Sequence, residues 1–148
     1  MNGIGTTAYL ARELSAASPA KRVAMLIDRA IGSLGEAVQA IERGDIQARW
    51  NANQRATNII ETLWRTLDLE KGGEIAANLE KLYSFMLNRL TQVDIKNDPA
   101  PAREVATLLE PLRRSWHELA QREAQTAAAQ RPDPAASATP ERRLAVSA

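Results

Sequence analysis

Apolar residues recur at steps of three and four along four stretches of the chain, the spacing of one face of an α-helix. The first stretch opens at Ser18-Pro19, where Ser18 can accept a bond from an unpaired amide and Pro19 fits the first helical position. The others open after Gly44, after Gly72-Gly73 and after Asn97-Asp98-Pro99. In chain order, the stripe positions are Val23, Ile27, Ala30, Leu34, Val38, Ile41; Ile46, Trp50, Asn53, Ala56, Ile60, Leu63, Leu67; Ile75, Leu79, Leu82, Met86, Leu90, Val93; and Val105, Leu109, Leu112, Trp116, Leu119.

The four stretches have similar lengths and short connectors. Each spans about 22 to 25 residues, which corresponds to a helix of roughly 33 to 37 Å. Equal helices with short joints predict an all-α fold, an antiparallel up-down four-helix bundle. Pro111 lies inside the fourth stretch and predicts a kink there or a late helix start.

The bundle is expected to occupy residues 18–123. Residues 1–17 then form a short N-terminal cap segment. Residues 124–148 are rich in Ala and Pro and hold few large aliphatic side chains, which predicts a disordered tail. An extension of the fourth helix over residues 124–130 is the alternative for the first part of that tail.

The charge of the chain is balanced, with 19 basic and 18 acidic residues and a net charge of +1. This balance gives no basic face for nucleic acid and no polybasic anchor for a membrane surface. There is no run of about eighteen apolar residues, so membrane insertion is not expected. The N-terminus has no basic region followed by a long apolar one, so we expect a cytoplasmic protein rather than an exported one.

The inventory of reactive side chains is thin. The chain has no cysteine, and His117 is its single histidine. Zinc and di-iron sites need several ligands at fixed spacing, and Arg113 and Arg114 beside His117 would repel a cation. Gly72-Gly73 lacks the spacing of a phosphate loop. We therefore predict no catalytic residue, no metal site and no cofactor, and expect a protein that is not an enzyme.

The chain has more apolar helix surface than one stripe per helix requires. On helical wheels Tyr83 and Leu87 lie to one side of the third stripe, Met25 lies almost opposite the first, and Ile59 lies well off the second. A second apolar stripe needs a second partner. One interpretation is a groove that binds a helix of another protein. The alternatives are a wider core, or self-association of a structural or regulatory bundle as a homodimer.

The N-terminal segment is a candidate occupant of such a groove. The stretch around Tyr9 and Leu10 is short and amphipathic, so it can lie in the groove while the partner is absent. A frayed terminus is the alternative interpretation.

Several motifs resemble the FliS family of flagellin export chaperones, over roughly residues 4–123. The most specific of them is the Gly72-Gly73-Glu74-Ile75-Ala76 block with the following Leu82-Tyr83 pair. The other matching residues are Ala8-Tyr9, Ser18-Pro19, Met25-Leu26-Ile27-Asp28, Leu67-Asp68, Glu70-Lys71, Asn78-Leu79, Met86, Asn97-Asp98, Glu104-Val105, Leu108-Leu109 and Trp116.

This resemblance implies a cytoplasmic chaperone of flagellar type III secretion. It would bind the disordered C-terminal segment of flagellin, block premature polymerisation and pass its client to the cytoplasmic domain of the export gate. The resemblance assigns gate recognition to Tyr9 and to Ile4, and a cap that vacates the groove to the N-terminal segment. The expected partner-binding residues are Ile4, Tyr9, Leu10, Met25, Ile59, Tyr83 and Leu87.

Overall fold

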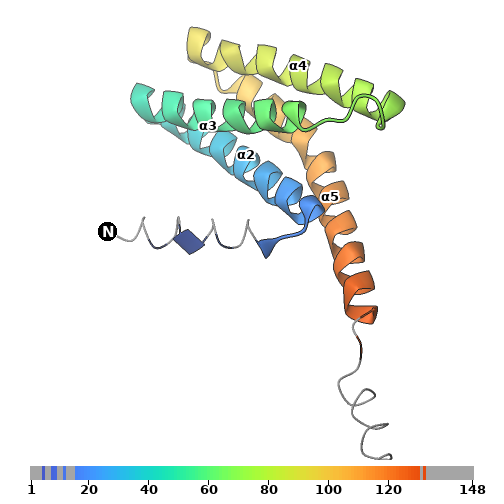
Figure 1. Cartoon of the computed structure of the whole chain (residues 1–148). Coiled ribbons are helices and arrows are strands. Elements are labelled where there is room, and N and C mark those ends of the chain that lie inside the picture. Colours follow the sequence, from blue (N-terminus) through green and yellow to red (C-terminus); the bar gives the residue numbers. More distant parts are fainter. Residues whose placement is uncertain (1–4, 6–7, 10–11, 13–15, 131, 133–148) are drawn as a thin grey trace, which may run out of the picture.

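The structure is a computed structural model that describes residues 5, 8, 9, 12, 16–130 and 132. Four long helices make up the described body (Figure 1): α2 (Pro19–Glu42), α3 (Ile46–Arg65), α4 (Gly73–Lys96) and α5 (Ala100–Ala129). The described residues contain no strand. Successive helices reverse direction through short connectors, and α2 and α4 each pack against both α3 and α5. The predicted all-α four-helix bundle is confirmed.

Local capping chemistry sets the helix starts where the sequence predicted them. The Ser18 hydroxyl accepts a hydrogen bond from the Lys21 amide at 3.2 Å, and Pro19 occupies the first turn of α2. The Asp45 carboxylate accepts a hydrogen bond from the Ala48 amide at 3.0 Å and caps α3. Each bond satisfies one amide that has no partner within its helix.

The connector between α3 and α4 depends on its two glycines. Gly73 has a φ of +54°, which an L side chain rarely adopts. A Cβ atom on Gly72 would lie 2.5 Å from the Cβ of Ala76 and 2.6 Å from the carbonyl oxygen of Asp68. The Gly72 amide donates to that same carbonyl at 2.8 Å. The pair therefore closes a tight helix joint, as the sequence indicated.

The last helix is longer than predicted. α5 begins at Ala100, so Pro111 does not mark a late start, and it continues through Ala129. Residues 124–129 therefore belong to a helix, which agrees with the alternative of an extended fourth helix rather than a tail that starts at residue 124. Alanine has the highest helix propensity, and the alanine-rich end of α5 continues a helix already held in the bundle. Residues 131 and 133–148 of the predicted tail lie outside the described residues.

The core consists mainly of aliphatic side chains from all four helices, together with Tyr83. Its largest fully buried members are Tyr83, Ile27, Leu34, Ile60, Met86, Leu90, Leu109, Val93 and Val105. Four stripe positions assigned to the interior are instead exposed, namely Ile46, Trp50, Ile75 and Leu119. Ile46 and Trp50 lie in the first two turns of α3, and Ile75 lies in the first turn of α4.

A polar clasp explains the two exposed residues of α3. We use this name for Arg49, Asn53, Asp94 and Asn97. Arg49 donates to the Asp94 carboxylate at 3.2 Å and to the side-chain oxygen of Asn97 at 2.6 Å. Asn53 donates to Asp94 and to the Leu90 carbonyl, both at 2.9 Å. The clasp turns Arg49 and Asn53 toward α4, and this rotation leaves the neighbouring Ile46 and Trp50 facing outward.

Candidate functional site

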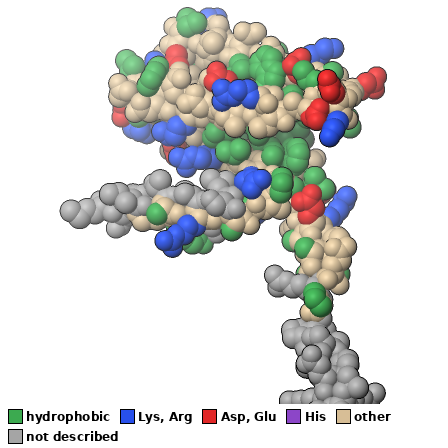
Figure 2. Space-filling model, in the orientation of Figure 1, with side chains coloured by type: hydrophobic (Ala, Val, Ile, Leu, Met, Phe, Trp, Pro, Cys, Tyr) green, Lys and Arg blue, Asp and Glu red, His purple; other side chains and the backbone are tan. Residues whose placement is uncertain are grey.

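An apolar groove opens at the end of the bundle opposite the clasp, where α2 and α4 begin and α3 ends. Its volume is about 660 Å³. Its lining residues are Pro19, Arg22, Val23, Leu26, Leu63, Thr66, Leu67, Asp68, Lys71, Gly72, Ile75, Ala76, Leu79, Tyr83 and Trp116. Figure 2 shows hydrophobic side chains exposed below the region of α3 and α4, close to where α2 begins and α5 extends away from the bundle.

Four helices and one connector create the groove. α2 and α4 lie diagonally in the bundle, so their facing surfaces meet only across its interior. At this end Val23 of α2 and Leu79 of α4 line opposite sides of the opening, with Trp116 of α5 beside them. The chain around Gly72 turns the corner from α3 to α4 and completes the rim.

The charged lining residues are exposed and partly committed to local contacts. Arg22 donates to the Ala17 carbonyl at 3.2 Å. The Asp68 carboxylate accepts from the Lys71 amide at 3.0 Å, which orients it toward its own connector. Charge therefore lies around the opening, whereas the deeper lining is formed by aliphatic and aromatic side chains.

The structure does not bring the four predicted groove residues of the bundle together. Tyr83 lines the groove but is only 2% exposed, and Ile59 is buried in the core away from the groove. Leu87 is half-buried against the core. Met25 is half-buried on another side of α2, beside Ala17. The placement of Ile59 and Tyr83 outside the core is corrected: each helix packs against two neighbours, so its buried sector is wider than one stripe.

The predicted N-terminal residues are only partly described. Tyr9 is exposed, while Ile4 and Leu10 lie outside the described residues. The described residues before Pro19 are absent from the lining of the groove. Their predicted contacts with the groove and with other proteins stay predictions.

Sequence reasoning missed most of the true lining. Val23, Leu67, Ile75 and Leu79 were read as core positions because they continue the stripes of their helices, and Leu26 was not selected at all. One signal was available: the second stripe ends at Leu67 and the third begins at Ile75, so both apolar ends flank the same glycine joint. Leu67 and Ile75 therefore have fewer neighbouring helix residues to bury them than the middle of each stripe has.

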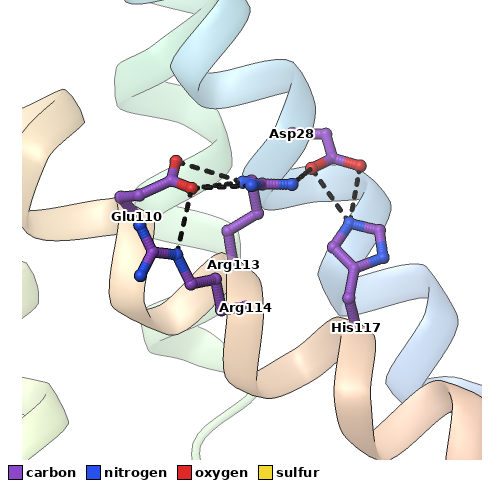
Figure 3. Close-up of polar contacts among 5 residues, drawn as sticks. All are labelled: Asp28, Glu110, Arg113, Arg114 and His117. Carbon is purple, nitrogen blue, oxygen red and sulfur yellow. Dashed lines mark hydrogen bonds and ion pairs between the residues drawn. The ribbon is translucent and has the colours of Figure 1, made fainter.

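Charged side chains join α5 to α2 beside the groove (Figure 3). The His117 ring lies 2.9 and 3.0 Å from the two oxygens of Asp28, and Arg113 lies 2.6 Å from Glu110 and 3.8 Å from Asp28. The hydrogen bond from Arg113 lowers the pKa of Glu110, and the same contact raises the pKa of the Arg113 guanidinium. The Arg113–Asp28 and His117–Asp28 contacts join α5 to α2, whereas the Glu110–Arg113 ion pair lies within α5.

The described residues hold no group of three or more His, Cys, Asp or Glu side chains that could bind a metal ion. No helix in the described part of the chain is both long and apolar enough to cross a bilayer. The fold and the groove thus define an all-α bundle with an apolar groove at one end.

Comparison with known proteins gives the family. The sequence model of the family described as "Flagellar protein FliS" matches residues 2–123. The chain is 41% identical over 104 residues to the flagellar secretion chaperone FliS of Salmonella typhimurium, covering 70% of this chain and 77% of the relative. It is 38% identical over 107 residues to the FliS of Vibrio cholerae (72% and 79%) and 32% identical over 117 residues to that of Bacillus subtilis (79% and 86%). The chain belongs to the FliS family of flagellar secretion chaperones.

Proposed function

We propose that this protein is a non-enzymatic cytoplasmic chaperone that binds the disordered C-terminal segment of flagellin, prevents its premature polymerisation and delivers it to the flagellar export gate. The observation that carries the proposal is the apolar groove at the open end of the bundle, in a chain of the FliS family. A segment that is disordered when free loses entropy on binding, so its chaperone must offer a continuous apolar surface in return.

The groove is suited to the apolar face of a helix. Val23 and Leu26 are one helical turn apart on α2, and Ile75 and Leu79 are one turn apart on α4. A client helix laid between them would contact both pairs with residues at i, i+3, i+4 and i+7. Burying one large aliphatic side chain contributes roughly 1.5–3 kcal/mol, so a few such contacts yield a complex that forms readily and still dissociates.

The remaining predicted contacts extend this proposal. Leu87 and Met25 are half-buried and can meet client residues outside the groove. Ile4 and Leu10 are proposed to belong to an N-terminal cap that leaves the groove when the client arrives. Tyr9 is proposed to contact the export gate, together with Ile4, because Tyr9 is exposed on the described surface.

Titration of the purified chain with a C-terminal flagellin fragment tests the proposal. We expect a one-to-one complex by light scattering after gel filtration, with the fragment gaining helical circular dichroism as it binds. Removing residues 1–14 should leave the thermal transition of the bundle in place and raise client affinity. If no binding is seen and the fraction of dimer increases with protein concentration, the alternative of a self-associating bundle would be favoured.

A further inference from the structure

Tyr83 is a buried lining residue of the groove whose hydroxyl has no hydrogen-bond partner among the described residues. Its side chain is 2% exposed and lines the groove from α4. Within the described part of the chain its hydroxyl forms no hydrogen bond. It is also not among the fully enclosed unpaired side-chain atoms, since Asn53 Oδ1 is the one such atom among the described residues. The hydroxyl of Tyr83 therefore keeps some contact with solvent, and its side chain lines the groove.

The other polar side chains of the lining differ from Tyr83. Thr66 donates its hydroxyl to the Leu63 carbonyl at 2.9 Å, so its hydrogen is already used. Arg22, Asp68 and Lys71 are exposed and remain hydrated. Among the described lining residues, Tyr83 is the one buried polar side chain whose hydrogen-bonding capacity is unused.

Occupancy of the groove changes the surroundings of this hydroxyl. In the empty groove water can satisfy it. An apolar client face would expel that water and leave a buried donor and acceptor without a partner, which is costly. A client that presents a polar group above Tyr83 avoids this cost. A site that hydrogen-bonds its ligand therefore discriminates strongly against ligands that lack the matching group.

We propose that the Tyr83 hydroxyl is a specificity determinant of the groove, and that it selects client segments whose apolar face carries one uncharged polar side chain, Ser, Thr, Asn or Gln, at the register above it. The inference rests on the proposed function and adds a rule about which segments fit. An uncharged partner is expected because a charged client side chain would lose its hydration in the covered groove, which is costly. The neutral phenol of Tyr83 offers such a partner both a donor and an acceptor.

The test compares Tyr83→Phe with a matched control, Thr91→Val. Thr91 is exposed on the same helix, is not part of the groove lining, and bonds only the Asn88 carbonyl, at 2.7 Å. Calorimetric titration with the flagellin C-terminal fragment should show about a tenfold loss of affinity for Tyr83→Phe and no change for Thr91→Val. The thermal midpoint of client-free Tyr83→Phe should match that of the wild type, because no internal hydrogen bond is lost.

Client variants complete the test and do not depend on the folding of Tyr83→Phe. Each Ser, Thr, Asn or Gln of the bound apolar face is replaced by Ala. One replacement should weaken binding to the wild-type chaperone about tenfold and have no further effect on Tyr83→Phe. If Tyr83→Phe binds as tightly as wild type, or no client position couples to it, the inference is overturned while the proposed function stands. A wild-type chain that binds no flagellin fragment would overturn both.

Discussion

Two isoleucines of α4 provide a matched test of the proposed client-binding groove. Ile75 is 74% exposed and lines the groove, whereas Ile95 is 73% exposed near the other end of the same helix and is outside the groove lining. The two side chains have the same chemistry, the same secondary structure and nearly the same exposure. Replacing each by alanine therefore removes the same apolar surface from two places on the molecule.

The expected difference follows from burial. Fully burying an isoleucine side chain contributes roughly 1.5–3 kcal/mol, and about three quarters of Ile75 is available to be covered by a client. Ile75→Ala should therefore weaken client binding by roughly 1–2 kcal/mol, or about 5- to 30-fold. Ile95→Ala should leave the affinity unchanged. Neither substitution opens a core cavity, so both variants should unfold within about 0.5 kcal/mol of wild type.

Calorimetric titration of the two variants with one flagellin C-terminal fragment measures this difference directly. Urea unfolding of the client-free proteins shows whether the bundle is intact. Equal affinities for Ile75→Ala and Ile95→Ala would refute the placement of the client in this groove. A larger loss for Ile95→Ala would move the binding surface to the clasp end of the bundle.

Three further predictions concern the bundle. Gly72→Ala should destabilise it by about 1–3 kcal/mol in urea unfolding because of the close contacts around the added Cβ. Gly35→Ala, whose added Cβ meets nothing within 4 Å, should be neutral or stabilising. Equal changes in the free energy of unfolding for the two variants would refute this explanation. Arg49→Met should cost about 1.5–3 kcal/mol in the same assay, and a variant as stable as wild type would show that the clasp contributes little. The lowered pKa of Glu110 means that its ionised form stabilises the fold above its ordinary pKa of 4.5 and that this contribution is lost as the pH falls through the folded-state pKa. The thermal midpoints of wild type and Glu110→Gln should therefore differ at neutral pH and converge in acid, and a gap independent of pH would contradict the role of the Arg113 contact.

The helices could be predicted because their boundaries are set by local chemistry. Ser18-Pro19 and Asp45 provide side-chain caps within one turn of each helix start. Gly72 is required by close contacts with Asp68 and Ala76, and Gly73 by its φ of +54°. Such signals depend on neighbours in the sequence, so reading the chain is sufficient to place them.

The rotation of each helix could not be predicted in the same way. Trp50 and Arg49 are adjacent, and hydrophobicity favours burying the tryptophan. The structure buries Arg49 because Asp94 and Asn97, about 45 residues away along the chain, accept its hydrogen bonds. Only the fold brings these partners together, so tertiary contacts override the local preference. The groove has the same origin, since its lining comes from four helices and one connector.

The same hydrogen bonds explain why the groove stays open although its walls are apolar. Apolar surfaces attract one another, and α4 would bury Ile75 and Leu79 by tilting toward α2. Two contacts with α3 oppose this tilt: the clasp holds the end of α4, and the Trp64 indole donates to the Glu80 carboxylate at 2.9 Å nearer its start. Two fixed points restrain the direction of a rigid helix, so closing α4 on α2 is expected to cost a partly buried hydrogen bond. Replacing Trp64 by Phe keeps the aromatic ring and removes the second point, so the groove should narrow and bind its client more weakly.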